Sequence, residues 1–265
     1  MKSIRCGRGL GDSLYLQSVV RHLVRRDGVR LQVLSDWPDV FSPLGDAVEV
    51  VPFRREKVGI VAHYVMRKQV EGTTQFEDCC HAAGIQEKVE LRLDWPAAEG
   101  ALIERLQAHG KPIVCVQLPR APMNRDDGFG TELLPDCRAI QRLIDELQGS
   151  ATLVQIGAGE PLYRFDGITE DLANRTSVRE LIDVASVAAG FIGYCSFVLP
   201  LAESLDKPAL LVWSRRGLES GTPFVRAITP RKLLHKKTSM WLMDDARDER
   251  VKDTLDEFRR LADCR

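Results

Sequence analysis

Apolar residues along the chain follow two spacings, which alternate from one segment to the next. Short continuous runs, such as residues 113–118, are typical of strands buried in a parallel sheet. Between these runs, apolar residues recur every three or four positions, as at Leu16, Val19 and Leu23, which indicates helices packed on a sheet. The alternation predicts an α/β fold in which parallel strands are joined by right-handed helical crossovers.

Two segments, one in each half of the chain, combine a short strand, a tight polar turn and a helix. The first turn spans residues 7–12 and follows a short strand expected at residues 4–6. The second turn spans residues 193–196 and follows the apolar residues Phe191 and Ile192. Such a turn places backbone N–H groups against a ligand. Because each half carries one motif of this kind, we predict two Rossmann-like domains that face each other across a cleft.

The expected domain boundaries follow from the loops and from the last helical pattern. Gly and Pro at 110–112 interrupt the periodicity, so we place an N-terminal domain at residues 1–107 and a C-terminal domain at residues 108–243. Residues 244–265 contain an amphipathic helix whose apolar face includes Phe258. We expect this helix to pack back on the N-terminal domain.

The composition narrows the class of protein. Of the 265 residues, 28% are charged and 44% are apolar, and the net charge of −1 gives no general reason to expect nucleic acid or an anionic membrane as a partner. No apolar run approaches the ~20 residues of a membrane span, and the chain enters a strand directly instead of a signal peptide. The 7 cysteines are scattered, without a C-x-x-C pair, so we expect reduced thiols in a cytoplasmic protein and no metal site.

Three short motifs carry a resemblance to a known family. They are Gly-Leu-Gly-Asp at 9–12, Gly-Ala-Gly-Glu at 157–160, and Gly-Tyr-Cys-Ser at 193–196 with the Leu-Ala and Lys-Pro pairs that follow it. Together they resemble the ADP-heptose:lipopolysaccharide heptosyltransferases and their relatives, glycosyltransferase family 9, which have the GT-B fold. The resemblance implies inverting, metal-independent sugar transfer that needs no cofactor. It also implies a nucleotide-sugar donor of ADP or UDP type on the C-terminal domain and an acceptor hydroxyl on the N-terminal domain.

The third motif also departs from the family pattern. Cys195 stands where the family has Asp, Phe197 where it has Gly, and Pro200 where it has His. Losing the glycine removes room for the backbone to approach a phosphate closely, and losing Asp and His removes polar contacts. The fold is therefore a firmer expectation than the donor that it binds.

On the acceptor side, the resemblance implies that Asp12 is the general base and that Gly11 and Ser13 lie beside the acceptor. The residue type alone also fits a second role, because Asp is a favourable cap for the helix that we expect over residues 13–26. A helix N-terminus lowers the pKa of a carboxylate, which makes it a weaker base. Both roles remain open.

On the donor side, we expect Ser196 to be the N-cap of a helix over 197–205. The resemblance implies that Glu160 accepts hydrogen bonds from a ribose and that loop arginines hold the diphosphate. Each expectation has a simpler alternative, namely a capped core helix, an exposed glutamate and solvated arginines. The full set of expected donor-binding residues is Arg120, Arg125, Gly157, Glu160, Gly193, Cys195, Ser196 and Phe197.

Residues 215–237 carry seven Lys and Arg residues against one acid, Glu219. This basic segment could line the donor site or meet an anionic acceptor, or it could be a solvated face balanced by the acid-rich residues 244–263. Three hypotheses follow. The chain is a GT-B glycosyltransferase, a GT-B binding protein that has lost catalysis, or a glycosyltransferase that acts on modified nucleic acid, for which the basic segment is the sole support.

Overall fold

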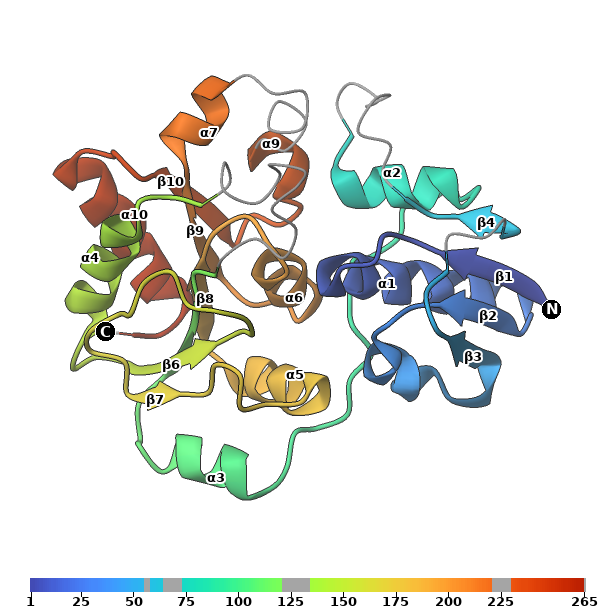
Figure 1. The fold of residues 1–265 in the computed structure, drawn as a ribbon, viewed down its shortest axis with the longest axis horizontal. Helices are drawn as coiled ribbons and strands as arrows, with labels where there is room; N and C mark the ends of the chain where they lie inside the picture. Colours follow the sequence, from blue (N-terminus) through green and yellow to red (C-terminus); the bar gives the residue numbers. More distant parts are fainter. Residues whose placement is uncertain (55–57, 64–72, 121–133, 221–229, 265) are drawn as a thin grey trace.

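The computed structural model describes residues 1–54, 58–63, 73–120, 134–220 and 230–264, and two separate sheets organise them (Figure 1). The first sheet has the strand order β3-β2-β1-β4, and the second has the order β10-β9-β8-β5-β6-β7. Neighbouring strands in both sheets are parallel. The prediction of an α/β fold with two Rossmann-like halves is therefore confirmed.

The first sheet is built from the N-terminal part of the chain. Its strands are β1 (Lys2–Arg5), β2 (Leu31–Leu34), β3 (Val48–Val51) and β4 (Ile60–Val61). The helical segments around it are α1 (Leu10–Asp27), the 3-10 segment η1 (Pro38–Ala47) and α2 (Gln75–Ala82). Leu16, Val19 and Leu23 are all buried, as the spacing predicted.

The second sheet is built from the C-terminal part. Its strands are β5 (Ile113–Gln117), β6 (Thr152–Ile156), β7 (Glu170–Asp171), β8 (Gly190–Gly193), β9 (Ala209–Trp213) and β10 (Ser239–Met243). The helices of this half are α3 (Ala101–Gln107), α4 (Cys137–Leu147), α5 (Val178–Val187), α6 (Val198–Ser204), α7 (Arg215–Ser220), α9 (Pro230–Leu233) and α10 (Asp248–Leu261). Because β8, β5 and β6 are neighbours, the loops at their carboxyl ends lie at one edge of the sheet.

The placement of the last helix differs from the prediction. α10 packs on β9 and β10 of the second sheet and lies beside α4, not on the N-terminal half (Figure 1). Its Phe258 is fully buried in the apolar cluster that contains Val114 and Ile192. A Cβ added at Gly190 would lie 2.7 Å from the Phe258 ring. An amphipathic pattern specifies which face of a helix is buried but not which sheet covers it, so the prediction failed at that step.

The two halves share one apolar cluster. It runs from Ile4 and Leu14 in the first half to Leu201 and Ala209 in the second, and helices α1 and α6 pack on each other within it. In Figure 1, α1 and α6 meet at the centre of the molecule. No helix in the described ranges combines the length and apolar character that crossing a membrane would require.

Candidate functional site

The first turn leads from β1 into α1, and it holds the Asp12 carboxylate close to its own backbone. The Gly9 N–H donates to Asp12 Oδ2 at 3.0 Å, and the Cys6 thiol lies 4.0 Å from Oδ1. Asp12 is half-buried in the first turn of α1, where a carboxylate that bonds a free N–H stabilises the helix. The expectation that Asp12 is the cap of a helix that starts at residue 13 is wrong, because α1 begins at Leu10 and its N-cap is Gly9. Asp12 instead lies in the first turn and accepts the N–H of the N-cap residue, as in a capping box. Its role as a base stays a prediction.

Ser13 lies directly after Asp12 but has a buried partner in its own domain. Its hydroxyl and that of Ser35, just after β2, are 2.8 Å apart, and the Ser13 side chain is almost wholly buried. This pair joins α1 to the end of β2. Contact between Ser13 and an acceptor remains a prediction.

The turns of the two halves touch at Gly11. A Cβ added at Gly11 would lie 3.1 Å from Pro200 Cγ and 3.4 Å from Phe197 Cα. A Cβ at this position would force its neighbours to shift by a few tenths of an ångström, so glycine suits this close approach. Two of the three positions that depart from the family pattern therefore form the contact between the halves.

The second turn is held by a residue that the sequence analysis did not select, Gln117. Its Oε1 accepts the Tyr194 N–H at 3.2 Å, and its Nε2 donates to Ser196 Oγ at 2.6 Å. A Cβ added at Gly193 would lie 2.6 Å from Gln117 Oε1, so glycine at this position leaves room for the Gln117 amide in its observed place. The expectation that Ser196 caps the next helix is wrong, because α6 begins at Val198 and its N-cap is Phe197.

Arg120 lies beside the loop that carries the second motif, as predicted. Its Nη1 donates to the Ala158 carbonyl at 3.4 Å. Asn174 closes the same loop, since it accepts the Gly159 N–H at 2.7 Å and donates to the Gly159 carbonyl at 3.0 Å. The Asn174 N–H also donates to the Gly157 carbonyl at 2.8 Å. The structure therefore brings Arg120 and residues 157–160 together at the carboxyl edge of the second sheet.

Two further donor-side candidates have less structural support. Glu160 is exposed, which fits either a ribose contact or a solvated loop residue. Arg125 lies outside the described residues.

Cys195 differs chemically from the aspartate that the family has at this position. Burial raises the pKa of its thiol to about 12, so the side chain is neutral at physiological pH. A neutral thiol is a weak hydrogen-bonding group. Cys195 therefore cannot form the charged contacts that an aspartate at this position could form.

Of the two residues that the sequence analysis missed, one had a recognisable signal. Gln117 is the polar end of an otherwise apolar strand run, and a buried polar side chain at a strand end points to a hydrogen-bonding role. Asn174 had none, because an Asn in a polar loop looks like any other turn residue. Its backbone φ of 60° and its loop contacts appear only in the structure.

A polar cluster between the halves lies next to the site. The Tyr15 hydroxyl on α1 is 3.0 Å from His235 Nε2, which in turn is 3.9 Å from Oε2 of the buried Glu203 on α6. Burial raises the pKa of Glu203 to about 7 and lowers the pKa of His235 to about 4. Phe76 on α2 packs on the rings of Tyr15 and His235. His235 is thus part of the interior.

Three of the described residues in the basic segment are paired with carboxylates. Arg215 pairs with Asp245 at 2.9 Å, Lys232 with Asp78 at 3.0 Å and Lys236 with Asp206 at 2.9 Å. The Lys232 pair joins α9 to α2 across the two halves. This pairing agrees with a locally balanced surface and gives no support to the nucleic-acid hypothesis.

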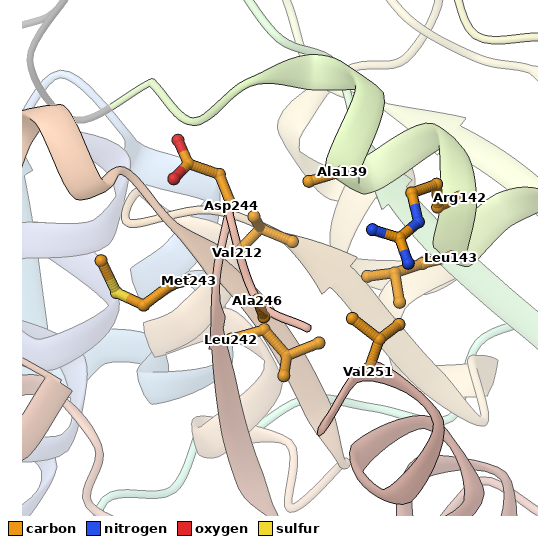
Figure 2. Close-up of a pocket in the computed structure, with 9 residues that line it drawn as sticks. All are labelled: Ala139, Arg142, Leu143, Val212, Leu242, Met243, Asp244, Ala246 and Val251. Carbon is orange, nitrogen blue, oxygen red and sulfur yellow. The ribbon is translucent and has the colours of Figure 1, made fainter. Parts of the chain in front are cut away.

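A pocket in the second half lies away from these turns (Figure 2). It lies between α4, β9, β10 and α10, on the sheet face opposite α6, and apolar side chains form most of its lining. Its charged groups have protein partners, since Arg142 pairs with Asp248 at 2.5 Å and Asp244 accepts backbone N–H groups of Asp136 and Arg215. Within the described ranges, no three His, Cys, Asp or Glu side chains are grouped so that they could hold a metal ion.

Comparison with known proteins supports the fold. No protein-family model matches the sequence, and no curated protein matches it. The solved structure of ADP-heptose LPS heptosyltransferase II from E. coli superposes over 99% of this chain and 98% of its own, with a TM-score of 0.63 and 12% identity. A glycosyl transferase of family 9 from Veillonella parvula covers 98% of this chain and 97% of its own, with a TM-score of 0.64 and 9% identity.

The iron-containing dodecameric heptosyltransferase TibC, solved in complex with ADP-D-β-D-heptose, covers 90% of this chain and 61% of its own, with a TM-score of 0.58 and 14% identity. At such low identities the likeness establishes the fold. The chain therefore has the GT-B-like fold of the family 9 heptosyltransferases, which confirms the resemblance at the level of architecture.

Proposed function

We propose that this chain is a glycosyltransferase that moves a sugar from a nucleotide-diphosphate donor of ADP or UDP type to an acceptor hydroxyl. The contact between Gly11 and Phe197 carries the proposal. Asp12 follows Gly11 and Ser196 precedes Phe197, so this contact brings the candidate base and the candidate donor turn to one place. Structures with the same fold, from ADP-heptose-dependent enzymes, support a nucleotide-sugar as the donor.

The proposed roles follow from the chemistry of sugar transfer. Direct displacement requires a base to remove the acceptor proton, and it requires donors to stabilise the leaving diphosphate. Asp12 would serve as the base from the N-terminal half. Arg120, residues 157–160 and the turn 193–196 would hold the donor on the C-terminal half. We propose that transfer inverts the anomeric centre and needs no metal.

A second candidate is a nucleotide-binding protein that has lost catalysis. The specific observation in its favour is that Phe197 and Pro200 fill the space beside Gly11, while Cys195 supplies a neutral thiol in place of a carboxylate. A bulky side chain at this turn reduces the room for a phosphate, and a missing charge weakens polar recognition.

Two measurements test the proposal and separate the candidates. Calorimetry with ADP, UDP and GDP at millimolar concentration tests nucleotide binding, and hydrolysis of a panel of nucleotide-sugars tests catalysis. We expect one nucleotide to bind and its sugar conjugate to be hydrolysed slowly in the absence of acceptor. Binding without hydrolysis or transfer would favour the binding protein, and the absence of binding by all three nucleotides would overturn both candidates.

A further inference from the structure

Gln117 is the polar end of a strand whose other residues are apolar. It occupies the last position of β5, and only 2% of its surface is exposed. Burying an amide is unfavourable unless both of its ends form hydrogen bonds. Its two partners therefore account for its presence at this position, and both belong to the turn 193–196.

The orientation of the Gln117 amide is fixed by the backbone. The Tyr194 N–H can only donate, so the atom that faces it at 3.2 Å must be the carbonyl oxygen of the amide. The amide nitrogen is then directed at Ser196 Oγ, at 2.6 Å. A flipped amide would place two donors against each other.

This orientation determines the direction of the Ser196 hydroxyl. The oxygen of Ser196 already accepts a hydrogen bond from Gln117, so its own proton must point elsewhere. In the described part of the chain, no protein acceptor pairs with that proton, and Ser196 is only half-buried. The turn 193–196 thus presents the Ser196 hydroxyl as a hydrogen-bond donor to a ligand beside it.

We propose that Gln117 is a positioning residue that directs the Ser196 proton to a phosphate group of a bound nucleoside diphosphate. The inference rests on the proposed function and adds a residue to it. An ionised phosphate accepts hydrogen bonds and donates none, so a hydroxyl can bind it only by directing its own proton toward it. Gln117 ensures that direction without touching the ligand.

The substitution Gln117→Glu tests this inference. The carboxylate still accepts the Tyr194 N–H, but it also accepts the Ser196 proton and turns it away from the ligand. A hydrogen bond to a charged group is worth roughly a tenfold to hundredfold change in Kd, so we expect ADP affinity to fall by at least about tenfold. Gln155→Glu is the matched control, because Gln155 is similarly buried on the adjacent strand β6. We expect ADP affinity within about twofold of wild type in the control.

A double-mutant cycle distinguishes orientation from charge repulsion. In a Ser196→Ala background there is no hydroxyl to orient, so Gln117→Glu should change ADP affinity by less than about threefold. An equal loss in both backgrounds would mean that the new carboxylate simply repels the ligand, and it would overturn the inference. If Gln117→Glu does not fold, Gln117→Met in the same two backgrounds removes the donor without adding charge and should show the same dependence on Ser196.

The wild-type titration separates the inference from the proposed function. If wild-type protein binds none of ADP, UDP and GDP, the proposed function fails and the inference fails with it. If wild-type protein binds ADP and Gln117→Glu binds equally well, the inference alone is wrong.

Discussion

At the residue scale, the most consequential feature is the pair of apolar side chains that replace Gly and His of the family motif. Phe197 and Pro200 pack on Gly11, where the two halves meet. Asp12 follows Gly11 in the chain and Ser196 precedes Phe197, so this contact lies between the candidate base and the candidate donor turn. If a diphosphate binds here as we propose, the side chain of Phe197 is expected to limit its space.

Replacing Phe197 with Gly tests this effect. The substitution removes the Cβ that lies near Gly11 together with the ring that it carries, so we expect ADP to bind at least about tenfold more tightly, provided that the protein remains folded. Phe53→Gly is a suitable control, because Phe53 is also half-buried but lies beside Arg5 in the first half. Calorimetry on both variants would measure the change. Equal ADP affinity in Phe197→Gly and wild type would show that the ring does not restrict the site.

The role of Asp12 can be tested by Asp12→Asn. The amide oxygen of Asn can still accept the Gly9 N–H, so we expect the melting temperature and the nucleotide affinity to stay close to wild type. General-base assistance is worth ~10²–10⁴-fold, so turnover should fall by at least about a hundredfold. Asp39→Asn, in the first turn of η1, is the control and should retain full turnover. Turnover above about a tenth of wild type in Asp12→Asn would restrict Asp12 to capping.

The sequence allowed part of this site to be predicted. Arg120 and the loop 157–160 could be placed together because parallel strands bring their carboxyl ends to one edge. Ser196 was assigned to the right turn but to the wrong contact, because its partner Gln117 lies 79 positions earlier in the chain. Hydrogen bonds between distant segments depend on strand order, which the local pattern does not specify.

At the element scale, residues 90–94, in the stretch of chain that links the first sheet to the second, are bonded to helix α1. The Ser18 hydroxyl donates to the Arg92 carbonyl at 2.8 Å and accepts the Arg92 N–H at 3.1 Å. The Gln17 side chain bonds the backbone of Asp94 in the same two-way manner. The Leu93 N–H donates to the Ser204 carbonyl of α6. The connecting segment therefore contacts helices of both halves.

Ser18→Ala should weaken this attachment. The substitution leaves the Arg92 N–H and carbonyl without their partner in a part-buried position, which costs about 1–3 kcal/mol of the free energy of unfolding. Urea denaturation would measure the loss, and hydrogen exchange should accelerate at residues 90–94. Ser42→Ala is the control, because the Ser42 side chain is exposed and bonds only a nearby carbonyl. Equal stability of Ser18→Ala and wild type would show that the attachment contributes little.

The sequence predicted the positions of strands and helices along the chain better than it predicted which elements pack on one another. The continuous apolar run at 113–118 predicted β5, and the three- and four-residue spacing predicted α1. The target of α10 could not be predicted in this way. Its apolar face fits any exposed sheet face of suitable size, and the choice of the second sheet depends on the space left between α4 and β10.

At the scale of the whole molecule, the two halves meet around the cluster of Tyr15, His235 and Glu203. Glu203 Oε1 accepts hydrogen bonds from the Ser239 hydroxyl and from the backbone N–H groups of His235 and Lys236. Burial nevertheless dominates, so the pKa of Glu203 rises to about 7, and burial lowers the pKa of His235 to about 4. In weakly acidic solution the folded state therefore holds a neutral pair, whereas the unfolded chain holds both groups charged.

The two shifts have opposite effects on stability. The raised pKa of Glu203 means that the folded state binds an extra proton between about pH 4.5 and pH 7, so this contribution is lost as pH rises through that range. The lowered pKa of His235 means that the folded state binds fewer protons between about pH 4 and pH 6.5, so its contribution grows as pH rises. Where the ranges overlap, the two contributions largely cancel.

Removing one partner should expose the effect of the other. In Glu203→Gln, stability relative to wild type should increase as pH rises from about 4.5 to about 7, with a slope of at most about 1.4 kcal/mol per pH unit. In His235→Gln, stability relative to wild type should decrease as pH rises from about 4 to about 6.5. Urea denaturation of each variant and of wild type at several pH values measures these differences, and groups unaffected by the substitutions cancel. If both differences are independent of pH, neither Glu203 nor His235 changes its protonation state when the protein unfolds. The cluster would then join the halves through packing and neutral hydrogen bonds alone.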